Sequence, residues 1–149
     1  MKKSFIFLFA FIIMSSTFAQ KTYLHCGKLI NTKSGKVDTE MTIIVFENKI
    51  IDVKKGYTLP ENKEDIQIDL KQKTIMPGLI DMHVHIESQM SPASYIEGYT
   101  LNEADIAFNS VNYAEITLLA GFTTVRDLGG SGGKISRRNA INKGKIIGP

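Results

Sequence analysis

The stretch Thr74-Ile-Met-Pro-Gly-Leu-Ile-Asp-Met-His-Val-His-Ile86 decides how this sequence is interpreted, because it joins a long apolar run to two histidines. A nearly continuous apolar run is typical of a strand buried on both faces of a parallel sheet. Pro77 has no N–H to donate to a ladder, so we expect the buried strand to begin after it. The segment therefore predicts an α/β fold with two polar residues at the carboxyl end of a buried strand.

The two histidines, His83 and His85, are spaced as metal ligands on a strand would be. Residues i and i+2 of a strand point to the same face, so two imidazoles would project side by side with their Cβ atoms about 7 Å apart. Imidazole is a common ligand of zinc and related ions. A histidine pair alone also fits a core or interface role, but ligands of parallel α/β folds gather at this end of the strands. We interpret both residues as ligands of a divalent metal whose other ligands come from elsewhere.

The residues after the histidines alternate between helical and strand patterns. The expected elements are an irregular loop at 87–99, a helix with a Thr100–Glu103 capping box that ends at Gly121, a strand at Phe122–Leu128, a glycine-rich turn at Gly129–Gly133, a helix at Ser136–Lys143, and the approach to a third strand at Ile146–Pro149. The turn lacks the lysine pattern of a phosphate-binding loop, so we interpret it as a flexible βα loop. The alternation implies a parallel sheet with right-handed crossovers.

Residues 20–75 predict a separate, small β-rich domain. Its β-rich runs, such as Met41–Phe46 and Ile66–Leu70, are short and closely spaced, as in a small sandwich or roll. The single cysteine, Cys26, excludes an internal disulfide, and we expect it to be a partly buried strand residue. We expect His25 to have a surface or β-domain role away from the metal.

Residues 1–19 have the pattern of a secretory signal peptide. Lys2 and Lys3 precede an apolar core over residues 5–14, and small residues lead to a cleavage point after Ala19. The apolar run is shorter than the ~20 residues of a membrane span. We therefore predict export to the periplasm or the extracellular space and no membrane attachment after cleavage, with an uncleaved N-terminal anchor as the alternative.

Composition and charge narrow the class of partner. The chain is 43% hydrophobic and 22% charged, which is ordinary for a globular protein, and its formal net charge is +3. Because two of the positive charges lie at the extreme N-terminus, no nucleic-acid partner is indicated. One local basic cluster is interpreted as a solvated helix face: Lys134, Arg137, Arg138, Lys143 and Lys145.

Pro77-Gly-Leu-Ile-Asp-Met-His-Val-His85 closely resembles the first-strand signature of the amidohydrolase superfamily. Gly121-Phe-Thr-Thr-Val-Arg-Asp-Leu-Gly-Gly130 resembles the second barrel strand of its imidazolonepropionase-like and Xaa-Pro dipeptidase-like branch. The resemblance implies a (β/α)8 TIM-type barrel preceded by a small β-sandwich (composite) domain. It also implies one or two divalent ions, with zinc expected, and His83 and His85 as ligands of the more buried ion. The family's other ligands (a carboxylated lysine or glutamate, two histidines and an aspartate that is also the general base) would follow residue 149.

Three further residues are candidates for supporting the site. We interpret Asp81 as a structural residue or one that orients a histidine. Arg126 and Asp127 end the second strand, where either an internal Arg–Asp pair or a substrate contact is possible. No catalytic acid or base is assignable.

We therefore expect the N-terminal part of an exported metal-dependent amidohydrolase that acts on a small-molecule or peptide amide through metal-activated water. A (β/α)8 barrel needs ~250 residues, so residues 76–149 would hold its first two βα units. We expect this stretch alone to be inactive and poorly soluble. The alternative is a non-enzymatic exported β-domain binding protein with a vestigial barrel start.

Overall fold

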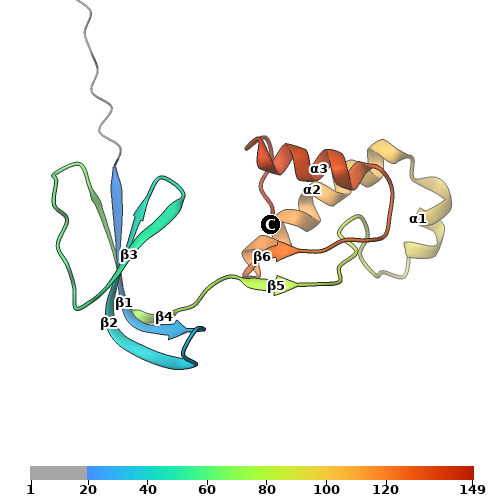
Figure 1. Ribbon diagram of the computed structural model, residues 1–149. Helices are drawn as coiled ribbons and strands as arrows, with labels where there is room; N and C mark the ends of the chain where they lie inside the picture. Colours follow the sequence, from blue (N-terminus) through green and yellow to red (C-terminus); the bar gives the residue numbers. More distant parts are fainter. Residues whose placement is uncertain (1–19) are drawn as a thin grey trace, which may run out of the picture. The chain divides into compact units, whose positions relative to one another are not determined.

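The computed structural model describes residues 20–149, which form two compact units on either side of the bond between Met76 and Pro77 (Figure 1). The elements of the first unit are β1 (Lys21–Asn31), β2 (Lys36–Phe46), β3 (Lys49–Lys55) and β4 (Ile66–Ile75). Those of the second are β5 (Leu79–Asp81), α1 (Ser94–Thr100), α2 (Glu103–Leu119), β6 (Phe122–Val125) and α3 (Gly133–Asn142). The predicted signal peptide lies outside the described residues. No helix within residues 20–149 is long and apolar enough to cross a membrane.

The first unit is a mixed four-stranded sheet in the order β3-β2-β1-β4. β1 pairs with β2 in antiparallel and with β4 in parallel orientation, and the register along β4 shifts between Cys26 and Lys28. Gly27 occupies this bulge, where a Cβ atom would overlap the carbonyl oxygen of Lys71. Glycine is therefore needed here because the β4 backbone approaches too closely for any side chain.

The two central strands of this sheet bury residues on both faces. On one face, Cys26, Met41 and Ile43 form a hydrophobic cluster. On the other, Thr42 is fully buried, and its hydroxyl donates to the carbonyl of Gly56 at 2.7 Å. Because the polar stretch after β3 covers this second face, the neighbouring His25 is also buried, at 2% exposure. The β-domain role expected for His25 holds and the surface role does not, while Cys26 is more deeply buried than expected.

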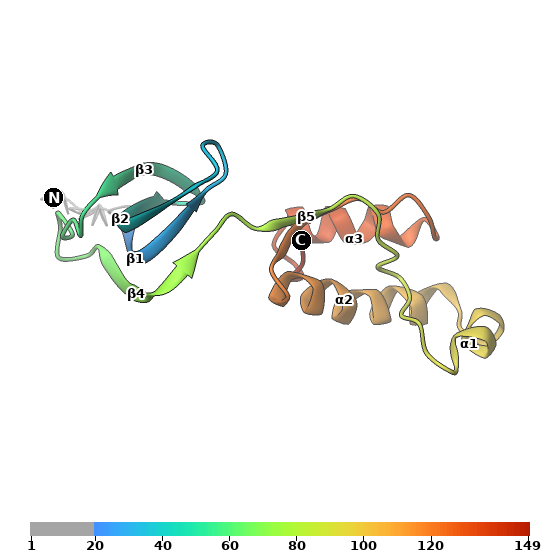
Figure 2. The ribbon, with the colours of Figure 1, turned by 90° about the horizontal axis from the view of Figure 1, so that it is seen from below.

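The second unit contains two parallel strands, β5 and β6, linked by a crossover through α1 and α2 (Figure 2). Gly78 precedes β5, and a Cβ atom there would overlap the side chain of Thr123 on β6. The amide of Leu79 donates to the carbonyl of Gly121 at 2.8 Å, so the pairing begins where α2 has just ended. This is the strand–helix–strand order that the sequence predicts.

Helix α2 begins two residues later than a Thr100–Glu103 capping box would require, so that prediction is wrong. Its N-cap is Asn102, whose side chain accepts hydrogen bonds from the amides of Ala104 and Asp105. The Asp105 carboxylate accepts in return from the Asn102 amide at 3.0 Å. Thr100 instead ends the short helix α1, where its hydroxyl donates to the carbonyl of Ile96. Both pairs have capping-box spacing, and the chain uses the one that follows the extended residue between the helices.

Replacing Asn102 with alanine should lower the free energy of unfolding by about 1 kcal/mol, because two amides of the first turn of α2 lose their acceptor. The matched control is Thr100→Ala, which removes one exposed hydroxyl at the end of α1 and should change stability by less. Chemical denaturation followed by circular dichroism measures both. Equal losses for the two variants would contradict the observed cap.

Other element boundaries differ from the sequence expectation. Helix α1 occupies part of the expected loop, β6 ends at Val125 rather than at Leu128, and α3 begins three residues early. Residues 146–149 contain no regular secondary structure. Strand β5 is not buried on both faces, since Ile80 is 62% exposed and, among the described residues, only β6 pairs with it.

Candidate metal centre

His83 and His85 lie immediately beyond the end of β5, not within it as the sequence predicts. The backbone nevertheless stays paired with the chain after β6. The amide of Arg126 donates to the carbonyl of Asp81 at 2.8 Å, and the amide of Val84 donates to the carbonyl of Arg126 at 3.1 Å. These hydrogen bonds keep the chain around Val84 extended, so the histidines on either side of Val84 lie next to each other. Their ring centroids are 5.2 Å apart and their ring planes are inclined by 56°.

This spacing fits a shared metal ion. A tetrahedral ion about 2.0–2.1 Å from one nitrogen of each imidazole holds the two ring centres roughly 5 Å apart. Both side chains are exposed, and neither imidazole forms a hydrogen bond with another residue of the described range. His25 contrasts with them, since its ring is buried and its Nε2 lies 2.8 Å from the carbonyl oxygen of Thr58. The chemistry and the spacing of His83 and His85 therefore suit zinc.

The described residues supply only part of such a site. Within residues 20–149, no group of three or more histidine, cysteine, aspartate or glutamate side chains is placed to hold a metal ion. A zinc site needs three or four ligands. The described residues can thus contribute two imidazoles to such a site, which is fewer ligands than a zinc ion needs.

Asp81 and Arg126 form hydrogen bonds with the backbone at and just before His83. Oδ1 of Asp81 accepts a hydrogen bond from the amide of His83 at 2.9 Å. Nε of Arg126 donates to the carbonyl of Met82 at 2.9 Å. Asp81 thus acts on the backbone of His83 and not on its ring. A substrate contact by Arg126 stays a prediction.

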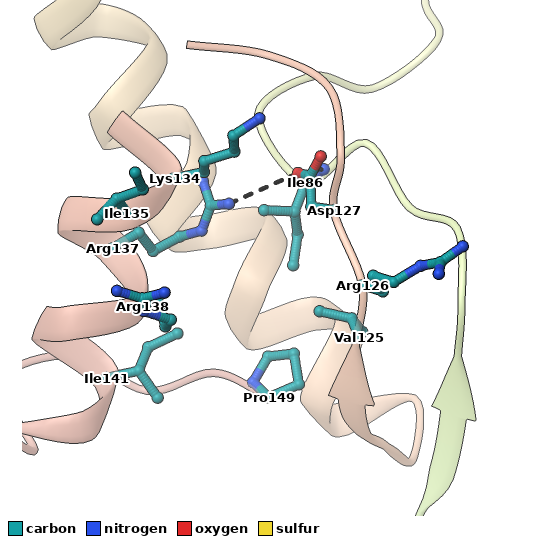
Figure 3. Close-up of a pocket in the computed structure, with 10 residues that line it drawn as sticks. All are labelled: Ile86, Val125, Arg126, Asp127, Lys134, Ile135, Arg137, Arg138, Ile141 and Pro149. Atoms are coloured by element: carbon teal, nitrogen blue, oxygen red, sulfur yellow. Dashed lines mark hydrogen bonds and ion pairs between the residues drawn. The ribbon is translucent and has the colours of Figure 1, made fainter. Parts of the chain in front are cut away.

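Asp127 is the centre of a different set of contacts. Its Oδ2 accepts from the amide of Ile86 at 3.1 Å, and its Oδ1 accepts from the amide of Gly129 at 3.1 Å. Its ion-pair partner is Arg137 on α3, 3.7 Å away, with side chains only 8% and 9% exposed (Figure 3). The internal Arg126–Asp127 pair is therefore wrong. Successive residues of extended chain point to opposite sides, and Figure 3 shows these two side chains diverging.

Arg137 is a buried cation, which also corrects the interpretation of the basic cluster as a solvated face. Burial lowers the pKa of its guanidinium, while Glu87 and Asp127 raise it. Its Nη1 is buried and has no hydrogen-bond partner among residues 20–149. Together with Lys134 and Arg138 it lines a cavity of about 280 Å³ beside the end of β6. Because arginine keeps its proton in proteins, a fixed positive charge lies next to Asp127.

Glu87 is a contact residue that the sequence does not reveal. Its Oε2 accepts from the amide of Ser131 at 2.6 Å, and its Oε1 accepts from the Ser131 hydroxyl at 2.9 Å. The partners are 44 residues apart, so no local pattern marks them. The turn at Gly129–Gly133, expected to be a flexible loop, is thus fastened to the chain just after the histidines.

Comparison with known proteins decides the family of this chain. The sequence profile described as "Amidohydrolase family" matches residues 74–149, which include both histidines and the Asp127 contacts. The chain belongs to the amidohydrolase family. Its architecture, a small β unit followed by the start of a TIM-type barrel, is shared with solved amidohydrolases, so the predicted fold class is confirmed.

Two solved structures illustrate the similarity. A Xaa-Pro dipeptidase with methionine bound in its active site is 42% identical, with a TM-score of 0.78 over 87% of this amidohydrolase chain and 32% of the dipeptidase. A prolidase complexed with N-methylphosphonate-L-proline is 27% identical, with a TM-score of 0.72 over 87% of this chain and 30% of the prolidase. These relatives confirm the predicted dipeptidase-like branch.

The curated relatives are similar over a shorter stretch. A dihydroorotase of Methanosphaera stadtmanae (strain ATCC 43021 / DSM 3091 / JCM 11832 / MCB-3) is 43% identical over 51 residues, which is 34% of this chain and 12% of that protein. The amidohydrolase chain described here thus spans about a third of the solved relatives and a smaller share of the dihydroorotase.

Proposed function

We propose that this protein is an exported, metal-dependent hydrolase that cleaves amide or peptide C–N bonds through metal-activated water. The observation that carries the proposal is the pair of exposed imidazoles, 5.2 Å apart, at the carboxyl end of β5. Membership in the amidohydrolase family supports it. Zinc is the proposed ion because its tetrahedral, nitrogen-rich coordination matches the donors present.

In this proposal His83 and His85 are ligands and not acids or bases. Each would offer one ring nitrogen to the ion, which binds only a nitrogen that carries no proton. A divalent ion, when bound, lowers the pKa of water to ~7 and polarises the substrate carbonyl. Asp81 and Arg126 keep the His83 backbone in place through the contacts described above. The proton acceptor and the acid for the leaving nitrogen come from residues outside this region.

The proposed substrate class is a dipeptide or a similar small amide. The Xaa-Pro dipeptidase and the prolidase are the solved relatives that support a peptide bond as the target. The dihydroorotase supports a cyclic amide instead. Because these relatives support different amides, a direct comparison of substrates is required.

Removing metal from the intact protein should abolish hydrolysis of its substrate, and adding zinc back should restore it. The assay compares Xaa-Pro dipeptides with other dipeptides and with a six-membered cyclic amide before and after dialysis against a chelator. We expect Xaa-Pro dipeptides to be cleaved fastest, with a loss of at least ~100-fold on chelation, since activated water is the nucleophile. Full activity in protein shown by elemental analysis to be free of metal would contradict the mechanism.

Export is proposed from the pattern of residues 1–19. N-terminal sequencing of the protein recovered from the periplasm or the medium should begin at Gln20. Recovery of uncleaved protein from the membrane fraction would support an N-terminal anchor instead. The alternative, a non-enzymatic binding protein, would use the β unit alone. The family match instead begins at residue 74 and includes both histidines, which favours the hydrolase.

A further inference from the structure

The two residues that follow His85 are tied to the turn that follows β6. The amide of Ile86 donates to Asp127, which also accepts from the amide of Gly129. Next along the chain, both carboxylate oxygens of Glu87 accept hydrogen bonds from Ser131. These contacts therefore fix the backbone immediately after His85, beyond the pairing of Val84 with Arg126.

The turn itself is shaped so that it can approach these groups. Gly130 has φ of +83°, a conformation that L side chains rarely adopt, and a Cβ atom there would overlap Oε2 of Glu87. A Cβ atom at Gly133 would lie 3.3 Å from Oε1 of Glu87. Glycine at these positions lets the backbone reach the carboxylate. The turn is therefore built around Glu87 and is not merely a flexible connection.

The same turn passes close to the imidazole of His85. A Cβ atom at Gly129 would lie 3.2 Å from Nδ1 and 3.3 Å from Cε1 of His85, so the Gly129 backbone lies against the ring. Nζ of Lys134 donates to the carbonyl of Gly129 and holds this peptide from the α3 side. Ser131, which Glu87 holds, thus lies only two residues after the glycine beside the His85 ring.

We propose that Glu87 is a positioning residue for the metal site: by clamping Ser131 it holds Gly129 against the His85 ring and keeps the ring oriented toward the ion. This inference rests on the proposed metal-ligand function of His83 and His85. Glu87 touches neither the ion nor the substrate, and acts through the glycine-rich turn. Partners that orient metal ligands typically change metal affinity by 10–100-fold when they are removed.

The first test is zinc affinity of the intact protein, measured by competition with a chromophoric chelator. Glu87→Gln should weaken zinc binding about 10-fold or more, since an amide nitrogen replaces one acceptor facing Ser131. The matched control is Glu115→Gln, on the exposed surface of α2, which should bind zinc as the wild type does. Ser131→Ala should give a smaller loss, and Ser131→Thr should restore wild-type affinity because it keeps both donors.

Two glycine variants test the same clamp without changing a charge. Gly130→Ala should reproduce the Glu87→Gln loss because its methyl group displaces the carboxylate. Gly132→Ala should be silent, since its φ is −63° and no atom lies within 4 Å of the added Cβ. The absorption spectrum of the cobalt-substituted protein reports ligand geometry directly, and we expect it to change in Gly130→Ala and not in Gly132→Ala.

The outcomes separate this inference from the proposed function. If His83→Ala and His85→Ala lose zinc while Glu87→Gln and Gly130→Ala retain wild-type affinity and cobalt spectrum, the positioning role is wrong and the metal site stands. If zinc binding survives in both histidine variants, the metal-ligand assignment itself is wrong. If Glu87→Gln fails to fold, the Ser131 pair and the two glycine variants decide the question.

Discussion

Alanine at His83 or at His85 should weaken zinc binding by more than about 100-fold, beyond the range seen when only an orienting partner is lost. Each imidazole supplies one of the three or four bonds that a zinc ion needs. Both side chains are exposed and neither imidazole forms a hydrogen bond in the described region, so the variants should fold normally. Elemental analysis of the purified intact protein, combined with chelator competition, measures the loss.

The third histidine provides a matched control. His25 is buried in the β unit, where its ring contacts Tyr57 and the Thr58 carbonyl. His25→Gln should lower the thermal midpoint but leave the zinc content unchanged. The opposite pattern, in which His25→Gln loses zinc and the other two variants keep it, would overturn the assignment of the site to the end of β5.

Removing the carboxylate of Asp127 should destabilise the second unit by about 3–5 kcal/mol, because the buried guanidinium of Arg137 loses its ion-pair partner. Both side chains are more than nine-tenths buried, and the carboxylate also accepts from two backbone amides. Asp127→Ala is expected to unfold at a markedly lower denaturant concentration than the wild type. Adding Arg137→Met to the same chain should recover part of the loss, since the buried positive charge is then gone.

An exposed ion pair in the same chain is the control for this prediction. Lys54 and Asp52 lie 3.6 Å apart with side chains 43% and 48% exposed. Asp52→Ala should cost about 1 kcal/mol or less, as solvated pairs do. If Asp127→Ala were no more destabilising than Asp52→Ala, the buried pair would not hold α3 against the end of β6.

Local patterns predicted the elements that depend on local chemistry. The order of strand, helix, strand and helix after Pro77 follows from apolar periodicity and glycine placement, and it is observed. The pairing of His83 with His85 follows from their spacing along extended chain, although the strand ends before them. The capping box was misplaced because Thr100–Glu103 and Asn102–Asp105 have the same spacing. Only the path of the chain between α1 and α2 distinguishes them.

Contacts between distant residues could not be predicted in this way. Asp127 was expected beside Arg126, its neighbour in sequence, but it pairs with Arg137 one helix later. Glu87 reaches Ser131 only because the parallel pairing of β5 with β6 brings the two following loops together. A carboxylate in a loop carries no sequence signal of the partner it will meet in the folded chain.

The sequence by itself determined the chemistry available at this site: two imidazoles side by side, carboxylates on both loops, and a glycine-rich turn, all within an amidohydrolase signature. The tertiary structure decided which of these groups meet. Side-chain type and spacing are properties of the chain, and they survive in any conformation. The contacts of Asp127 with Arg137 and of Glu87 with Ser131 exist only after the strands have paired and α3 has packed, because burial and proximity are created by folding.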